Sequence, residues 1–211
     1  GPFWWMFKGR RSYSVDVSVA VPRPAAASLG VVSGSVIASG LRGGVTVDVT
    51  SGSITLMGLD GPVRAKTVSG AIEALGVGQG GDLTVETVSG EITLADSSAQ
   101  RIFARTVSGA ITCDLDNPRA NDIRLDTTSG EITVRVPVDA DLGVNLSAVS
   151  GRITSAFPEV RPSGSPGLRS ATGLLGGGSG ALHAHAISGS VNLLARPMAE
   201  PDDANGGEPS P

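Results

Sequence analysis

The sequence predicts an all-β fold, a single-domain parallel β-solenoid (β-helix) of about nine coils with an 18 to 21 residue repeat. Two patterns and the composition support this prediction. A Ser-Gly dipeptide followed by Ile or Val returns at steps of 18, 18, 20, 19, 21, 21 and 38 residues. Apolar residues alternate with polar ones on both sides of it, which is typical of half-buried strands. With 30 glycines and only 3% aromatic residues, the chain suits a narrow interior of small aliphatic side chains.

The Ser-Gly dipeptide marks one turn of a repeat, because a fixed period near 20 residues indicates stacked units. The last step of 38 residues equals two periods of 19. A degenerate copy, Thr172-Gly173 with Leu175 in the place of Ile, lies inside it and brings the number of units to nine. The eight clear copies are Ser33 and Gly34, Ser51 and Gly52, Ser69 and Gly70, Ser89 and Gly90, Ser108 and Gly109, Ser129 and Gly130, Ser150 and Gly151, and Ser188 and Gly189.

The alternation changes phase at each dipeptide. In one unit Val45 and Val47 precede the serine at even distances, whereas Ile54 and Leu56 follow it at odd distances. A strand that changes phase needs a bulge or a corner, and glycine permits the backbone conformation of a corner. Antiparallel hairpins do not repeat one register at a 20-residue step, and propeller blades need about twice this period. The solenoid is therefore favoured over a sandwich or a propeller.

Residues 1–13 hold five of the chain's seven aromatic residues together with the basic residues Lys8, Arg10 and Arg11. One interpretation is an anchor at a membrane surface or a partner, since Trp and basic side chains suit lipid headgroups. The other is a cap over the apolar end of the solenoid, which we favour. In the anchor interpretation, the membrane or the partner would be contacted by Trp4, Trp5, Phe7, Lys8, Arg10 and Arg11.

The solenoid domain is predicted over residues 14–196, with a strand at Ser14 to Val21, and residues 197–211 form a disordered acidic tail. The four carboxylates of the tail account for the whole net charge of −4. A neutral body argues against a nucleic-acid partner. No apolar run is long enough to span a membrane and no segment resembles a signal peptide, so we expect a cytoplasmic protein with peripheral membrane contact as an alternative.

Charged residues at one outward position alternate in sign along the repeat. Three residues before each serine the chain carries Lys66, Glu86, Arg105 and Asp126. In adjacent parallel coils these side chains would form a charge ladder that sets the register. Glu131 and Arg152, two residues after their serines, are expected to pair in the same way.

Candidate chemistry is sparse, and we expect no cofactor. Cys113 is the single cysteine and occupies a predicted buried position, so it is interpreted as a small apolar residue. His183 and His185 share the outward face of one strand and are weak candidates for a metal pair, but no third ligand is visible. The polar stretch from Asp114 to Asp122 lacks the ligand spacing of a calcium loop.

Several motifs resemble the bacterial toast-rack family of β-strand-repeat proteins, for which "adhesin" is an architectural label. They are the Thr-Val-Ser-Gly-x-Ile units at residues 67–72, 87–92 and 106–111, the Gly-Leu-x-Gly-Gly/Pro-Val joints at 40–45 and 58–63, and the closing Gly-Leu-Leu-Gly-Gly-Gly-Ser-Gly at 173–180. The resemblance covers residues 3–197. It implies a parallel β-solenoid, no known catalytic residues, no established biochemical role and an N-terminally shortened chain.

The sequence therefore favours a non-enzymatic scaffold or interaction module with a protein partner. A carbohydrate-active β-helix enzyme and a membrane-associated envelope component are the alternatives, although enzymes of the first class need clustered carboxylates on one face. The unit from Leu182 to Leu193 is expected to end the stack, because Pro197 then stops further pairing. We expect a monomer or a small closed oligomer whose partner docks on a lateral face.

Overall fold

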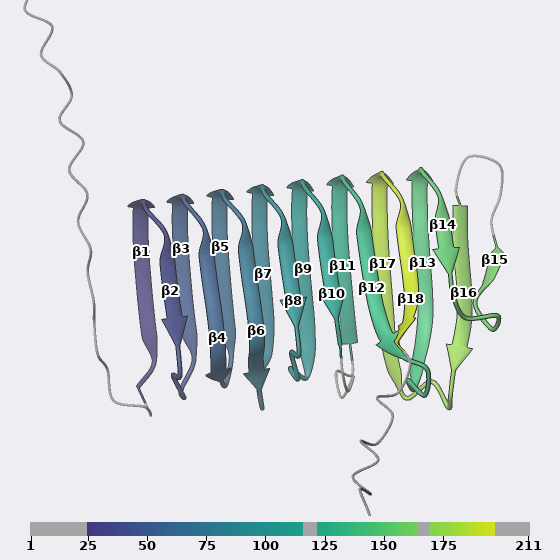
Figure 1. Cartoon of the computed structure of the whole chain (residues 1–211), viewed down its shortest axis with the longest axis horizontal. Coiled ribbons are helices and arrows are strands. Elements are labelled where there is room, and N and C mark those ends of the chain that lie inside the picture. The colour runs from purple at the N-terminus through teal and green to yellow at the C-terminus, as the bar shows by residue number, and fades with distance from the viewer. Residues whose placement is uncertain (1–24, 116–121, 164–168, 197–211) are drawn as a thin grey trace, which may run out of the picture.

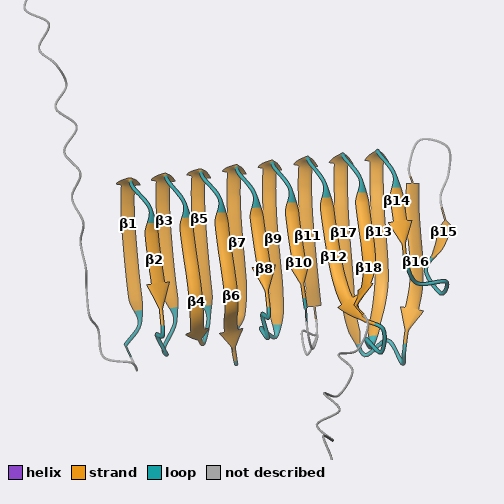
Figure 2. Cartoon of the chain, in the orientation of Figure 1, coloured by secondary structure: helices purple, strands orange, loops and turns teal. Residues whose placement is uncertain are grey.

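The structure, a computed structural model, describes residues 25–115, 122–163 and 169–196. Two extended sheets lie face to face and are joined along one edge (Figures 1 and 2). In spatial order the ten-stranded sheet contains β1 (Ala27–Ser33), β3 (Val45–Ser51), β5 (Val63–Ser69), β7 (Asp82–Ser89), β9 (Arg101–Ser108), β11 (Asp122–Ser129), β17 (Gly180–Ser188), β13 (Leu142–Ser150), β16 (Arg169–Leu175) and β15 (Arg161–Ser163). The eight-stranded sheet contains β2 (Val36–Ser39), β4 (Ile54–Asp60), β6 (Ile72–Gln79), β8 (Ile92–Ala95), β10 (Ile111–Asp114), β12 (Ile132–Pro137), β18 (Val191–Arg196) and β14 (Ile153–Ser155).

The predicted parallel β-solenoid is confirmed. Each coil consists of one strand from each sheet, and the two strands meet at a Ser-Gly corner. Neighbouring coils are parallel and in register, so that Ser51 pairs with Ser69 and Ser69 with Ser89. The side chains between the sheets are mainly Val, Ile, Leu and Ala, and Ile92 and Leu94, for example, are fully buried. Burial of these aliphatic side chains across the whole stack is the main source of its stability.

The corner requires glycine for two reasons. Gly90 has a φ of +159°, and a Cβ added there would collide with the backbone carbonyl of Gly70 in the preceding coil. The coils therefore approach at the corner more closely than any side chain permits. Thr106, buried just before the corner, donates a hydrogen bond of 3.3 Å to the carbonyl oxygen of Gly90. Thr67, Thr87 and Thr127 donate the same bond to the corner glycine of the coil that precedes each of them.

The order of the coils differs from their order in the sequence. The C-terminal coil, β17 and β18, lies between the coil of β11 and β12 and the coil of β13 and β14. It is therefore internal, and the expectation that Leu182 to Leu193 end the stack is wrong. The crossing is made by the turn at residues 176–179, which passes beside Ala140 and Asp141, the two residues before β13. Gly176 and Gly178, with φ values of +59° and +70°, give this turn the positive φ that it needs.

The ninth, degenerate unit is not a coil. Thr172 and Gly173 lie within β16, which runs antiparallel to β13 and pairs Gly173 with Val144. Gly173 is needed for another reason, because a Cβ there would collide with the backbone of Glu159 and Val160. The described residues thus form eight parallel coils followed by the antiparallel strands β16 and β15.

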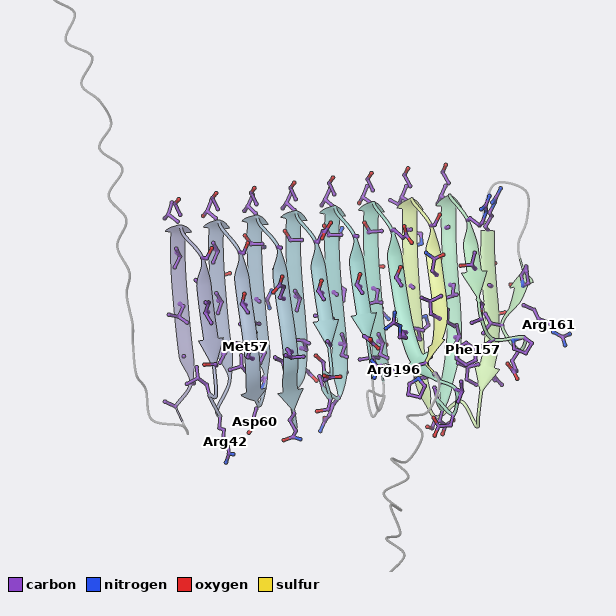
Figure 3. The ribbon with its side chains drawn as sticks, viewed as in Figure 1. Arg42, Met57, Asp60, Phe157, Arg161 and Arg196 are labelled. Atoms are coloured by element: carbon purple, nitrogen blue, oxygen red, sulfur yellow. The ribbon has the colours of Figure 1, made fainter. Side chains whose placement is uncertain are left out.

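The two ends of the stack differ. At the far end, Phe157, Val160 and Ala171 are buried against the last coil, and Figure 3 shows Phe157 at this end. At the β1 end, Leu29 and Val31 are only partly buried, whereas Val47 and Val49 at the same positions of the next coil are buried. The predicted cap or anchor at residues 1–13, the strand at Ser14 to Val21 and the tail at 197–211 lie outside the described residues. Within the described ranges, no helix could span a lipid bilayer.

Candidate interaction surface

The outer face of the ten-stranded sheet carries two regular rows of side chains beside the corner. The corner row consists of the residue before each repeat serine. In stack order it contains Val32, Thr50, Val68, Val88, Val107, Thr128, Ile187 and Val149. All eight are β-branched, and the six apolar members are 41–77% exposed. These side chains point outward because buried and exposed residues alternate along each strand. The alternation does not explain why six of them are apolar.

The repeat serines continue this surface onto the corner itself. All eight are exposed, and the serines of neighbouring coils pair in register. Figure 3 shows side chains projecting at even intervals along this corner edge. The corner row is therefore bordered on one side by a line of small hydroxyl groups.

The charge row lies two residues further from the corner on the same face. The predicted ladder is confirmed, because Lys66 pairs in register with Glu86, Glu86 with Arg105, and Arg105 with Asp126. Lys66 Nζ lies 3.7 Å from Glu86 Oε2. Asp48 precedes this ladder and His185 follows it, and both occupy the same offset from their serines. The place of His185 beside Asp126 could not be found from the sequence, because it depends on the inserted C-terminal coil.

The expected pair of Glu131 and Arg152 does not form. The inserted coil places Ser190 between them, since the amide of Ile132 donates to Ser190 and the amide of Val191 to Arg152. Glu131 instead accepts a hydrogen bond from the side-chain amide of Asn192. The prediction was wrong because it assumed that coils stack in sequence order.

Further from the corner, charged side chains surround Phe103 on the same face. An open depression of about 170 Å³ is lined in part by Phe103, Arg101, Arg124 and Asp82. Arg101 donates to both carboxylate oxygens of Asp82, with distances of 3.1 and 2.6 Å. These bonds hold the pKa of Asp82 below its ordinary value, so the carboxylate stays ionised and paired. A paired carboxylate of this kind is poorly suited to act as a general acid.

The two histidines lie on the outer face of β17, as their spacing predicted. His183 is next to Arg124 of β11, and His185 Nδ1 is 2.8 Å from the hydroxyl of Ser147. The guanidinium group of Arg124 would repel a metal ion at His183, and the hydroxyl of Ser147 already occupies one nitrogen of His185. No cluster of three His, Cys, Asp or Glu side chains suited to a metal occurs among the residues the structure describes.

Cys113 lies in the core between Leu94 and Val134 of the neighbouring coils. Burial, and secondarily the carboxylate of Asp114, raise the pKa of its thiol to about 12. The thiol therefore stays protonated at neutral pH, and its environment is that of a small apolar side chain.

These features define a class of protein: a parallel β-solenoid with glycine corners and long lateral rows of side chains. The family model for Toastrack DUF4097 matches residues 44–194. The chain belongs to this family, whose domain has no established function and is not known as enzymatic. Comparison with curated proteins and comparison with solved structures gave no match.

Proposed function

We propose that this chain is a non-enzymatic interaction module whose working surface is formed by the corner row and the charge row. The observation that carries the proposal is the unbroken line of exposed β-branched side chains across all eight coils. Isolated apolar residues are common on protein surfaces, but a contiguous apolar stripe flanked by polar groups is typical of a docking surface. A rigid solenoid presents such a stripe without a change in shape.

The groups available for catalysis support the same proposal. Asp82 is held ionised by Arg101, the Cys113 thiol is buried and protonated, and one nitrogen of His185 is occupied by Ser147. The depression beside Phe103 is small and open, whereas substrate pockets enclose most of their ligand. The carbohydrate-active alternative therefore has less support than a binding role.

Site-specific photo-crosslinking tests the proposed surface. A photoreactive amino acid replaces Val107 in the corner row or, as the matched control, Leu75, which is 49% exposed on the opposite sheet. We expect irradiation in the native cells to give a covalent protein adduct of defined mass from the position of Val107 and none from Leu75. Equal labelling at both positions, or none at Val107, would contradict the proposal.

A further inference from the structure

We propose that the partner of this surface is a second copy of the chain, related to the first by a two-fold axis that is parallel to the strands and passes between the fourth and fifth coils. The inference rests on the proposed function and adds the identity of the partner. In this arrangement the corner rows face each other, the charge rows face each other, and the two stacks run in opposite directions.

The first argument is the spacing of the corner row. Parallel strands in register place one side chain about every 4.8 Å along the stack. A partner that contacts these side chains along the whole row needs the same spacing. The corner row of a second copy has it by construction, so that each side chain of one row meets a side chain of the other at every coil.

The second argument is the charge row. A two-fold axis at the middle of eight coils places the first coil opposite the eighth and the fourth opposite the fifth. The charge row then brings Lys66 opposite Asp126 and Glu86 opposite Arg105. Asp48 faces the imidazole of His185, which can donate a hydrogen bond to the carboxylate. Each charge of the alternating row thus meets a complementary group, whereas an axis through the fourth or fifth coil would bring like charges together.

The same axis brings apolar residues together along the corner row. Val88 faces Val107, Val68 faces Thr128, and Val32 faces Val149. Thr50 faces Ile187 in the remaining pair of coils. Every pair therefore contains at least one apolar side chain that loses contact with water.

The charge complementarity between the two copies does not extend to the next row of the face, five residues before each serine. There the axis would place Arg64 opposite Arg124, so we confine the contact to the corner row, the charge row and the serines. A strip of eight coils and about four residues of strand length covers roughly 34 by 13 Å, or on the order of 900 Å² for both copies. This area lies below that of standard stable interfaces, so we expect a weak dimer with a dissociation constant in the micromolar range.

Sedimentation velocity over a range of micromolar concentrations tests the proposal. Wild type is expected to pass from monomer to dimer as its concentration rises. Val88→Asp and Val107→Lys should each weaken the dimer by about tenfold or more, because each buries an uncompensated charge at the centre of the contact. The double variant should recover most of the affinity, since the new carboxylate then faces the new ammonium group across the axis. Leu75→Asp, a control of similar exposure on the other sheet, should dimerise like wild type.

The outcomes separate this inference from the proposed function. Wild type that stays monomeric at every concentration, or a dimer that Leu75→Asp weakens as much as Val88→Asp does, would overturn the self-pairing. If the position of Val107 still gave a crosslinked adduct in cells with a mass other than twice that of the chain, the interaction surface would stand with a different partner. Filaments in place of dimers would also overturn the two-fold arrangement, because an isologous contact closes on itself.

Discussion

At the scale of single residues, the corner is controlled by contacts between backbones. Gly90 is needed because the preceding coil lies too close for any side chain, and Thr106 of the following coil donates its hydroxyl to the carbonyl oxygen of that same glycine. The glycine and the threonine therefore act together, one allowing the close approach and the other pairing the polar group that it leaves buried. Gly34 shows the contrast, because it has a similar φ of +144° but no coil beneath it.

Replacing Gly90 by alanine tests this explanation. The new Cβ must displace the backbone of Gly70, so we expect a loss of about 3 kcal/mol or more in the free energy of unfolding. Gly34→Ala carries only the strain of its positive φ and should cost about 1 kcal/mol. Urea unfolding of the two variants measures both values. Similar losses would mean that backbone conformation, rather than contact between coils, selects glycine.

A second residue-scale prediction concerns Ile92 and Thr93, which are adjacent in β8 but point to opposite sides of the sheet. Ile92 is fully buried and Thr93 is exposed. Ile92→Asp should cost about 4 kcal/mol because it buries an unpaired charge, whereas Thr93→Asp should cost under about 1 kcal/mol. Thermal unfolding compares the two, and equal shifts in melting temperature would contradict the assigned register.

At the scale of elements, the crossing turn at residues 176–179 allows the C-terminal coil to enter the stack. Asp141, the residue before β13, holds this turn by accepting hydrogen bonds from the amide and the hydroxyl of Ser179, at 3.1 and 2.7 Å. The hydroxyl bond, followed by the amide bond, lowers the pKa of the Asp141 carboxyl. One carboxylate therefore connects the coil of β13 and β14 to the coil of β17 and β18 beside it.

The lowered pKa predicts a dependence of stability on pH. A carboxyl whose pKa is lower in the folded state stabilises the fold above its unfolded pKa of about 3.9 and loses that contribution as the pH falls through the folded value. Asp141→Asn should therefore be less stable than wild type at neutral pH, and the difference should shrink below about pH 4. Urea midpoints across this range measure it. Asp139→Asn, a change at an exposed carboxylate two residues earlier, is the control and should show a smaller effect. A difference that does not change with pH would argue against the carboxylate's role.

At the scale of the whole molecule, the coils do not stack in the order in which they occur in the sequence. In the sequence β13 and β14 follow β12, but in the stack they lie two positions further on. The chain then reverses direction through β15 and β16. The position between the two coils is occupied by β17 and β18. The coil of β11 and β12 is therefore linked to the coil of β13 and β14 through β17 and β18, which follow both of them in the sequence. The face that carries the corner row is continuous only when this coil is in place.

Engineered disulfides test the order of the coils. A disulfide needs Cα atoms about 4.4–6.8 Å apart, which neighbouring strands satisfy and strands two positions apart do not. The pair Asp126→Cys and His185→Cys should therefore oxidise within one chain, whereas Asp126→Cys and Ser147→Cys should not. Cys113 is buried and should not interfere. Non-reducing electrophoresis and peptide mapping show which pair forms, and the opposite result would restore stacking in sequence order.

The amino-acid sequence by itself determined the solenoid, the corner glycines, the buried positions and the ladder from Lys66 to Asp126. Each follows from periodicity, because the repeat places equivalent residues at equivalent positions whatever the order of the coils. Tertiary structure alone decided that order, and with it the separation of Glu131 from Arg152 and the place of His185 beside Asp126. Identical registers make every coil an acceptable neighbour for every other, so the repeat carries no information on which pairs form. The order of the coils is decided where the sequence departs from the repeat, in β16 and the turn at residues 176–179. The contacts of these segments are with residues distant in the sequence.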